Sequence, residues 1–215
     1  SLRGKVIITL FYEPSTRTRV SFEQAGKLLS ADVINMGMSG SSIEKGESLL
    51  NTALTLQASR TDLIVIRHPH SGAPYFLARN LGNTGIINAG DGRHAHPTQA
   101  LLDLFTIRRR LGNMQGTKVV IVGDVVNSRV ARSDIIGLMM AGANVVLSGP
   151  PTLLPYPNWY VPYSADIQNG QGSSITIEPD LDKAIDGADA VIALRIQRER
   201  QQQGLIPSLR EYTRR

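Results

Sequence analysis

Short apolar segments alternate with segments of helical spacing along most of the chain. The apolar segments are rich in Val and Ile and end at Gly, Pro or polar residues, which is the pattern of buried strands. The predicted strands are Val6–Phe11, Ala31–Asn35, Leu63–Ile66, Gly85–Asn88, Lys118–Val122, Ala143–Leu147, Ile175–Ile177 and Ala190–Leu194.

Segments with apolar residues three or four positions apart lie between these strands and predict helices. The longest is expected over 97–111, because Pro97 suits the first turn of a helix and Gly112 follows the last turn. Other helices are expected after the turn at 13–16 and over 47–58, 129–141 and 181–185. The predicted apolar face of the longest helix comprises Ala100, Leu101, Leu104, Phe105 and Leu111, and that of the first comprises Phe22, Ala25, Leu28 and Leu29.

Strands that alternate with helices predict a mostly parallel sheet covered by helices on both faces. We therefore predict the α/β class, with two doubly wound parallel-sheet domains joined by the long helix at about 97–111. The domains are expected at 1–112, which includes the linking helix, and at 113–215. The chain starts almost directly on a strand and its second series has few elements, so we expect both ends to be truncated.

The composition narrows the class of protein. A hydrophobic fraction of 41% and a charged fraction of 19% are typical of globular proteins. No apolar run approaches the roughly 20 residues of a membrane-spanning helix, and no signal peptide opens the chain, so no membrane association is expected. The absence of cysteine excludes disulfides and thiolate chemistry and fits a cytoplasmic protein.

The net charge of +5 raises the question of nucleic-acid binding. The basic residues, however, do not gather in one stripe, and the runs at 108–110 and 214–215 are interpreted as solvated ends. Many of the others stand singly beside Ser, Thr, His or Pro at the ends of apolar runs. We therefore expect a small anionic ligand and no nucleic acid.

Polar side chains follow five of the predicted strands, at 15–19, 67–69, 90–99, 123–129 and 195–197. They are arginines, histidines and hydroxyl-bearing residues, without a cluster of cysteines or carboxylates that would suit a metal ion. Ligands of open α/β sheets bind beyond the carboxyl ends of the strands. The sequence therefore predicts an anion-binding cleft with no metal.

The segment Ser15–Thr18 lies at a strand-to-helix turn, where free backbone N–H groups and the helix dipole favour an anion. Hydroxyl groups add hydrogen-bond donors, and Arg17 adds a guanidinium suited to phosphate oxygens. The alternative is a simple helix N-cap, since Ser and Thr are common there. The segment lacks the Gly-Lys-Ser/Thr ending of a P-loop, and Gly123-Asp124 lacks a dinucleotide-binding fingerprint.

These residues also carry a family resemblance. Residues 11–19 (FYEPSTRTR) with 21–23 (SFE) resemble the carbamoyl-phosphate signature of the aspartate and ornithine carbamoyltransferases, and 96–103 (HPTQALLD) resemble the family's second signature. The similarity continues through 67–69, 123–124, 128–130 and 195–200 and covers essentially the whole chain in order. It implies a carbamoyl-phosphate-binding first domain and an aspartate-binding second domain.

The resemblance is closer to the aspartate enzymes. The loop 41–48 contains Lys45, which ornithine enzymes usually lack, and Thr98 stands where they carry cysteine. The two carboxylates of L-aspartate also suit the cations of Lys45, Arg129 and Arg195. The implied reaction gives N-carbamoyl-L-aspartate and phosphate, the committed step of de novo pyrimidine biosynthesis, without a cofactor. Two alternatives stay open: an enzyme for ornithine or another amine, and an inactive homologue that serves as a scaffold.

Roles follow from the resemblance. The implied catalytic residues are Arg17, Thr18, Lys45, Arg67 and His96. Carbamoyl phosphate is expected to contact Ser15, Thr16, Arg17, Thr18, Ser41, Arg67, His96 and Gln99, and L-aspartate to contact Lys45, Arg129, Arg195 and Gln197.

The family resemblance further implies a homotrimer with shared active sites, in which Lys45 and Ser41 reach a neighbouring subunit. It leaves open whether regulatory chains or a dihydroorotase bind the trimer. His94 is expected at the surface or behind the site, and Asp124 either orients Arg129 or caps its turn. Asn127 replaces a histidine that many relatives carry.

Overall fold

The computed structural model describes residues 1–37, 46–155 and 172–195. The chain divides into two compact units, Ser1–Thr98 and Gln99–Arg215. The elements of the first are β1 (Val6–Phe11), α1 (Thr16–Leu28), β2 (Asp32–Gly37), α2 (Leu49–Ala58), β3 (Leu63–His68), α3 (Ala73–Asn80) and β4 (Gly85–Asp91). Then follow α4 (Pro97–Leu111), β5 (Lys118–Val122), α5 (Arg129–Met140), β6 (Asn144–Ser148), the 3-10 helix η2 (Pro151–Leu153), β7 (Ile175–Ile177), α7 (Leu181–Ile185) and β8 (Ala190–Ala193).

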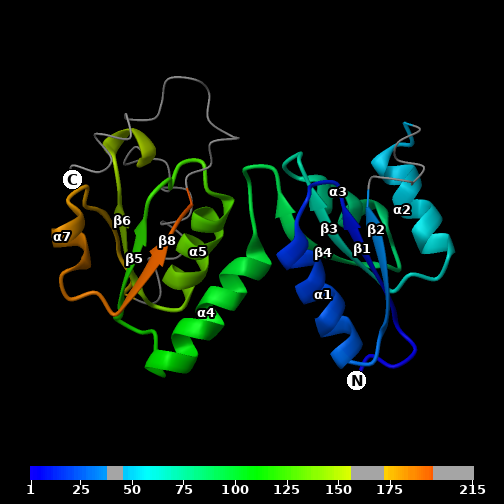
Figure 1. Cartoon of the computed structure of the whole chain (residues 1–215), viewed down its shortest axis with the longest axis horizontal. Helices are drawn as coiled ribbons and strands as arrows, with labels where there is room; N and C mark the ends of the chain where they lie inside the picture. The colour runs from blue at the N-terminus through cyan, green and yellow to red at the C-terminus, as the bar shows by residue number, and fades with distance from the viewer. Residues whose placement is uncertain (38–45, 156–171, 196–215) are drawn as a thin grey trace. The chain divides into compact units, whose positions relative to one another are not determined.

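The first unit is built on a four-stranded parallel sheet of order β2-β1-β3-β4 (Figure 1). Side chains alternate between its two faces, as the pleat of a strand requires. Ile7 and Phe11 of β1 pack with Phe22 of α1 on one face. Ile8 and Leu10 pack on the other face with α2 and α3. One face of the sheet therefore carries α1 and the other carries α2 and α3.

The second unit repeats this plan with a parallel sheet of order β7-β6-β5-β8. On one face, Val119 and Ile121 of β5 pack with Ile135 and Leu138 of α5. On the other face, Val120 packs in a smaller cluster with α7. Within each sheet, considered by itself, the carboxyl ends of the parallel strands lie at the same end. The polar residues that follow these strands therefore lie at that end of the sheet.

The predicted α/β class with two parallel sheets is confirmed. The bounds predicted for β1, α4, β5, β7 and α7 match the structure, while α3 was not predicted. The linking helix at 97–111 is present, and the division between the two units falls within its first turn. Among the described residues, no helix is long and apolar enough to cross a membrane.

The predicted apolar faces of two helices are right only in part: Ala100 and Leu104 of α4 and Phe22 of α1 pack against the cores, but other predicted members do not. On α4, Leu101 and Phe105 are 65% and 62% exposed, and the buried residues are Ala100 and Ile107. On α1, Leu28 is 85% exposed, and Gly26 is the residue closest to the sheet. A Cβ on Gly26 would lie 2.5 Å from Cγ2 of Val33, so the absence of a side chain sets the contact there.

Candidate functional site

The first candidate segment forms the start of α1. Ser15 stands at the N-cap position in an extended conformation, but its hydroxyl makes no capping hydrogen bond. The first turn contains no acidic residue, and the exposed Arg17 extends from it. The helix dipole and the N–H groups of this turn are therefore not neutralised by a carboxylate of the same turn, and this arrangement suits an anion.

Arg67 lies near the end of β3, beside the loop that leads into α1. Its Nε donates to Oε2 of Glu13 at 3.0 Å, and the side chains are 16% and 22% exposed. The backbone N–H of Tyr12 also donates to the carbonyl of Arg67 at 2.9 Å. These contacts join the end of β3 to the turn that carries Ser15 and hold a guanidinium close to that turn.

His96 is 7% exposed and precedes α4, and its Nδ1 lies 3.4 Å from Oγ1 of Thr98. The loop before it is organised by Asp91, which is 1% exposed. The Asp91 carboxylate accepts hydrogen bonds from the backbone N–H groups of Gly72 at 2.7 Å and Ala95 at 3.1 Å. It also accepts from the Asn88 amide at 2.8 Å and contacts Nδ1 of His94 at 3.1 Å.

The same loop packs closely on the segment after β3. Gly92 has φ +50°, and a Cβ there would lie 2.5 Å from Oγ and 2.7 Å from the backbone nitrogen of Ser71. Its own N–H donates to the carbonyl of His68 at 2.8 Å. The ends of β3 and β4 are thus fixed against each other, which limits the positions open to His96.

Gln99 lies in the first turn of α4, where its Nε2 donates to Oδ1 of Asp103 at 3.1 Å. Burial raises the pKa of Asp103, and the hydrogen bond from Gln99 opposes the shift. Since the amide nitrogen is engaged with Asp103, the orientation of the Gln99 amide is defined.

In the second unit, Arg129 is the first residue of α5 and is 3% exposed. The hydroxyl of Ser128 caps this helix by accepting from the N–H of Ala131 at 3.1 Å. The buried Asp124 accepts from the Asn127 amide at 2.9 Å, so it does stabilise its own turn. Arg195 follows β8 after Leu194 and is exposed.

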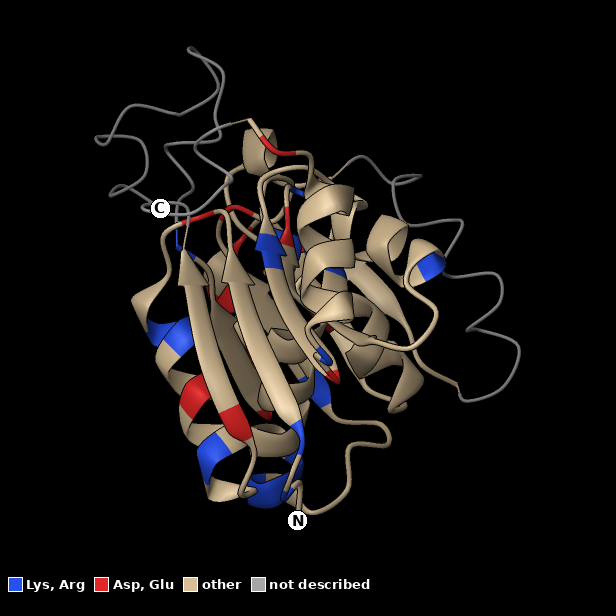
Figure 2. Cartoon of the chain, turned by 90° about the vertical axis from the view of Figure 1, so that its right-hand side faces the viewer, with Lys and Arg blue, Asp and Glu red and all other residues tan. Residues whose placement is uncertain are grey.

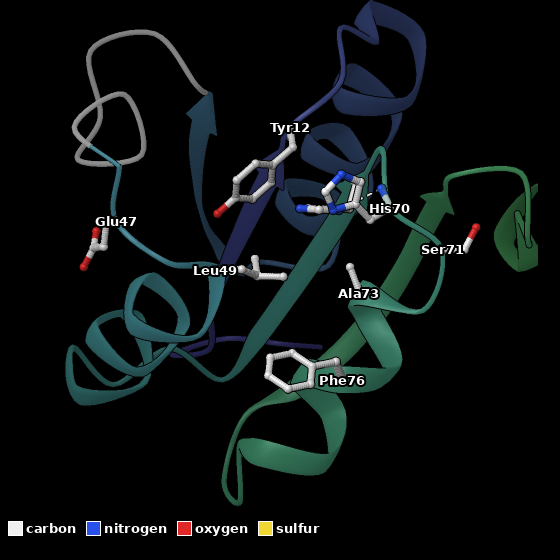
Figure 3. A pocket seen from close by; sticks show the side chains of 8 residues that line it. Tyr12, Glu47, Leu49, His70, Ser71, Ala73 and Phe76 are labelled. Carbon is white, nitrogen blue, oxygen red and sulfur yellow. Dashed lines mark hydrogen bonds between the residues drawn. The ribbon is translucent and has the colours of Figure 1, made fainter. Parts of the chain in front are cut away.

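A cavity of about 460 Å³ lies on the α2 and α3 side of the first sheet (Figure 3). Burial, followed by the neighbouring His70, lowers the pKa of His68, and burial raises the pKa of Tyr12. The lining residues are Tyr12, Glu47, Leu49, His68, His70, Ser71, Ala73 and Phe76, and none of them is a predicted site residue. The walls are mainly apolar and aromatic, so this cavity is a poor match for a phosphate.

Ser41, Lys45 and Gln197 lie outside the described residues. Within the described ranges, no group of three or more His, Cys, Asp or Glu side chains could hold a metal ion. Basic and acidic positions are interspersed on the side of the chain drawn in Figure 2. Sequence reasoning missed Glu13 as the partner of Arg67 and Asp91 as the centre of the His96 loop, although Glu13 stands inside the first recognised motif and Asp91 in the polar segment 90–99.

Two family models match the sequence of the chain. The aspartate/ornithine carbamoyltransferase carbamoyl-P binding domain matches residues 1–109, and the Asp/Orn binding domain of the same family matches residues 115–213. The chain belongs to the aspartate/ornithine carbamoyltransferase family. The carbamoyl-P model contains the start of α1, Arg67 and His96, and the Asp/Orn model contains Arg129 and Arg195.

Members of this carbamoyltransferase family resemble the chain over its full length. The aspartate carbamoyltransferase catalytic subunit of Roseiflexus castenholzii is 54% identical over 215 residues, which cover 100% of this chain and 64% of that protein. The corresponding subunit of Mycobacterium marinum is 53% identical, with 99% and 64% covered. The chain thus spans about 64% of the length of these relatives.

Solved structures of the family agree with the fold. Aspartate transcarbamoylase from Trypanosoma cruzi in complex with carbamoyl aspartate and phosphate superposes with a TM-score of 0.84 at 33% identity, covering 94% of this chain and 64% of that one. The catalytic subunit of the M. jannaschii enzyme superposes with a TM-score of 0.80 at 38% identity, covering 99% and 66%.

Proposed function

We propose that the protein transfers the carbamoyl group of carbamoyl phosphate to the amine of L-aspartate. The products are N-carbamoyl-L-aspartate and phosphate, which is the committed step of de novo pyrimidine biosynthesis. The observation that carries the proposal is the first turn of α1, which contains Arg17 and no acidic residue. The Glu13–Arg67 ion pair lies beside it, near the end of the neighbouring strand. The names of the most similar relatives and structures support the choice of L-aspartate.

Carbamoyl phosphate binds at the start of α1 in this proposal. Ser15, Thr16 and Thr18 offer hydroxyl groups, Arg17 offers a guanidinium, and the helix offers its N-terminal N–H groups to the phosphate oxygens. Arg67 bridges the phosphate and the carbonyl oxygen. The Ser15 hydroxyl, which makes no capping bond, supports this assignment over the simple N-cap alternative.

Thr18, Arg67 and His96 polarise the carbonyl and stabilise the oxyanion that forms when the aspartate amine attacks the carbonyl carbon. Gln99 orients the carbamoyl amide. The C–N bond forms, the bond from the carbonyl carbon to the phosphate oxygen breaks, and phosphate leaves with the electron pair and takes up the proton that the amine loses. Positioning and charge stabilisation account for the acceleration, and the residues named supply both.

L-aspartate is assigned to the second unit. Arg129 and Arg195 follow or border strand ends and offer guanidinium groups to the two carboxylates. Gln197 assists, and Lys45 completes the site.

We also propose a homotrimer in the cytoplasm, with Lys45 and Ser41 reaching a neighbouring subunit. The relatives' designation as catalytic subunits is compatible with regulatory chains or a dihydroorotase as additional partners.

The test is carbamoyl transfer by the full-length protein, with L-aspartate and L-ornithine offered separately beside carbamoyl phosphate. We expect carbamoyl-aspartate, and a loss in kcat of roughly 10²–10³ for His96→Ala, which removes an oxyanion donor. Product from ornithine alone would contradict the substrate assignment. A folded protein that makes neither product would favour the scaffold alternative.

A further inference from the structure

Two acidic side chains face each other where α4 and α5 pack together. Asp134 of α5 is 1% exposed, which is unusual for an aspartate with no ion pair to a described residue. One turn further along α5, a Cβ on Gly137 would lie 2.7 Å from Cδ1 of Leu104, the neighbour of Asp103 on α4. The two helices therefore approach closely at this level, and the carboxyl groups of Asp103 and Asp134 are near enough for each to shift the pKa of the other.

The contact needs a proton. Both carboxylate oxygens of Asp134 are buried, and no N–H or hydroxyl group in the described part of the chain donates to them. Two ionised carboxylates accept hydrogen bonds but cannot donate, whereas a protonated carboxyl donates one. Two ionised carboxylates this close, one of them fully buried, would also repel each other, so one proton remains on the pair.

The pair lies directly behind Gln99. Asp103 accepts the Gln99 amide N–H at 3.1 Å, so Asp134, Asp103 and Gln99 form a continuous chain of polar contacts from the core of the second unit to the start of α4. We propose that Asp134 is a positioning residue whose carboxyl proton holds Asp103, and through it the Gln99 amide, in the orientation that receives the carbamoyl group. The role of Gln99 in this inference rests on the proposed function, whereas the shared proton does not.

Electrostatic considerations agree with this geometry. Burial, followed by the charge of Asp103, raises the pKa of Asp134 to about 8. For Asp103, burial raises the pKa while the hydrogen bonds with Gln99 and Asp134 lower it. The groups that act on the two carboxyls are therefore each other and the Gln99 amide, and no lysine or arginine is among the causes of either shift. The proton is thus placed on Asp134, and Asp103 remains the acceptor.

The first measurement detects the proton without any ligand. In the full-length protein labelled with ¹³C at the aspartate carboxyl carbons, the Asp134 signal at pH 7 should have the chemical shift of a protonated carboxyl. The signal is assigned by its loss in Asp134→Asn. An Asp134 carboxyl that is ionised at pH 7 would overturn the inference, whether or not the protein is an enzyme.

The second measurement separates hydrogen-bond donation by residue 134 from the packing of its side chain. Asp134→Asn keeps an N–H donor for Asp103, whereas Asp134→Leu keeps the shape without a donor. We expect the KM for carbamoyl phosphate to stay within about twofold in the first variant and to rise about tenfold in the second, with a smaller change in kcat. Ile135→Val, a neighbouring buried change on α5, serves as the control for altered packing and should leave this KM unchanged.

The outcomes distinguish this inference from the proposed function. Equal KM values in the Asn and Leu variants would show that donation by residue 134 does not position Gln99. A wild-type protein that neither binds carbamoyl phosphate nor forms product would refute the proposed function. In that case the carboxyl signal still decides whether the shared proton exists.

Discussion

Nε of Arg67 lies 3.0 Å from Oε2 of Glu13, and both side chains are largely shielded from water. The pair spans two adjacent parallel strands, because Phe11 is in register with Arg67 at the ends of β1 and β3. A planar guanidinium that is held at Nε by a carboxylate has a defined plane. Glu13, which opens the turn before α1, therefore sets the direction of the Arg67 guanidinium. Binding of the phosphate assigned to that turn depends on Glu13 through Arg67, without a contact between Glu13 and the phosphate.

Glu13→Gln should weaken carbamoyl-phosphate binding. The amide keeps the size of the side chain but removes the charge that holds Arg67, and the loss of a charge-assisted hydrogen bond is worth roughly 1 kcal/mol at a partly exposed pair. We expect a rise in Kd of about fivefold, measured by calorimetric titration with carbamoyl phosphate.

Glu23→Gln is the matched control for this change. It also removes one ion pair, with Lys27 on the exposed side of α1, without a contact to Arg67 among those described. Its Kd should equal that of the wild type. An equal loss of affinity in both variants would mean that total charge, and not the direction of Arg67, governs binding.

Gly92→Ala should destabilise the first unit. The backbone there has φ +50°, and the new Cβ would meet the backbone nitrogen of Ser71 at 2.7 Å and the carbonyl of Pro69 at 2.9 Å. Positive φ and overpacking together should lower the free energy of unfolding by roughly 2–4 kcal/mol. Gly82→Ala is the control, because nothing lies within 4 Å of its added Cβ. Urea unfolding of the two variants in parallel measures the difference. Equal losses in the free energy of unfolding would show that close packing at Gly92 is not what the substitution disturbs.

Asp91→Asn should lower kcat, although Asp91 is not assigned a contact with substrate. The carboxylate accepts from Gly72, Asn88 and Ala95, and an amide would turn one acceptor into a donor facing other donors. The loop that carries His96 would shift, and a small misplacement of a catalytic group can cost about 10²-fold in rate. His94→Ala, which removes only an exposed partner of Asp91, should change kcat by less than about threefold.

Local patterns in the sequence predicted most elements because each depends on residues close together in the chain. The apolar run Val119–Ile121 and its polar flanks are sufficient to define β5, and Pro97 and Gly112 are sufficient to bound α4. The helix α3 was missed because its eight residues offer little periodicity: it begins after a left-handed Gly72 and exposes Tyr75 and Phe76.

Contacts between residues far apart in the chain could not be predicted from the sequence. The helical spacing suggested a buried face that included Leu101 and Phe105 beside Ala100. The structure buries Ala100 as expected but exposes the other two and buries Ile107, because packing within the folded unit selects the face. Nothing local indicates that Asp134 meets Asp103 or that Glu13 meets Arg67. The site residues were predicted because they follow strand ends, and this rule depends only on element order.

The stability of the full-length protein should fall between pH 5 and pH 8, and Asp134→Asn should remove much of this fall. Burial and the Asp103 carboxyl raise the pKa of Asp134 to about 8 in the folded state, against an ordinary pKa of 3.8 for an exposed aspartate. Between these values the folded protein keeps a proton that the unfolded chain releases, so the free energy of unfolding decreases with pH by up to about 1.4 kcal/mol per unit. The effect is fully developed once pH passes the folded pKa, and the slope then flattens.

Urea unfolding at half-unit pH steps measures this slope directly. The wild type should lose stability relative to Asp134→Asn steadily from pH 5 to about pH 8, while Ile135→Val should run parallel to the wild type, because it changes packing but no proton. Parallel curves for the wild type and Asp134→Asn would mean that the folded and unfolded states bind the proton of residue 134 equally. The Asp103–Asp134 pair would then hold no shared proton, and the inference would be overturned.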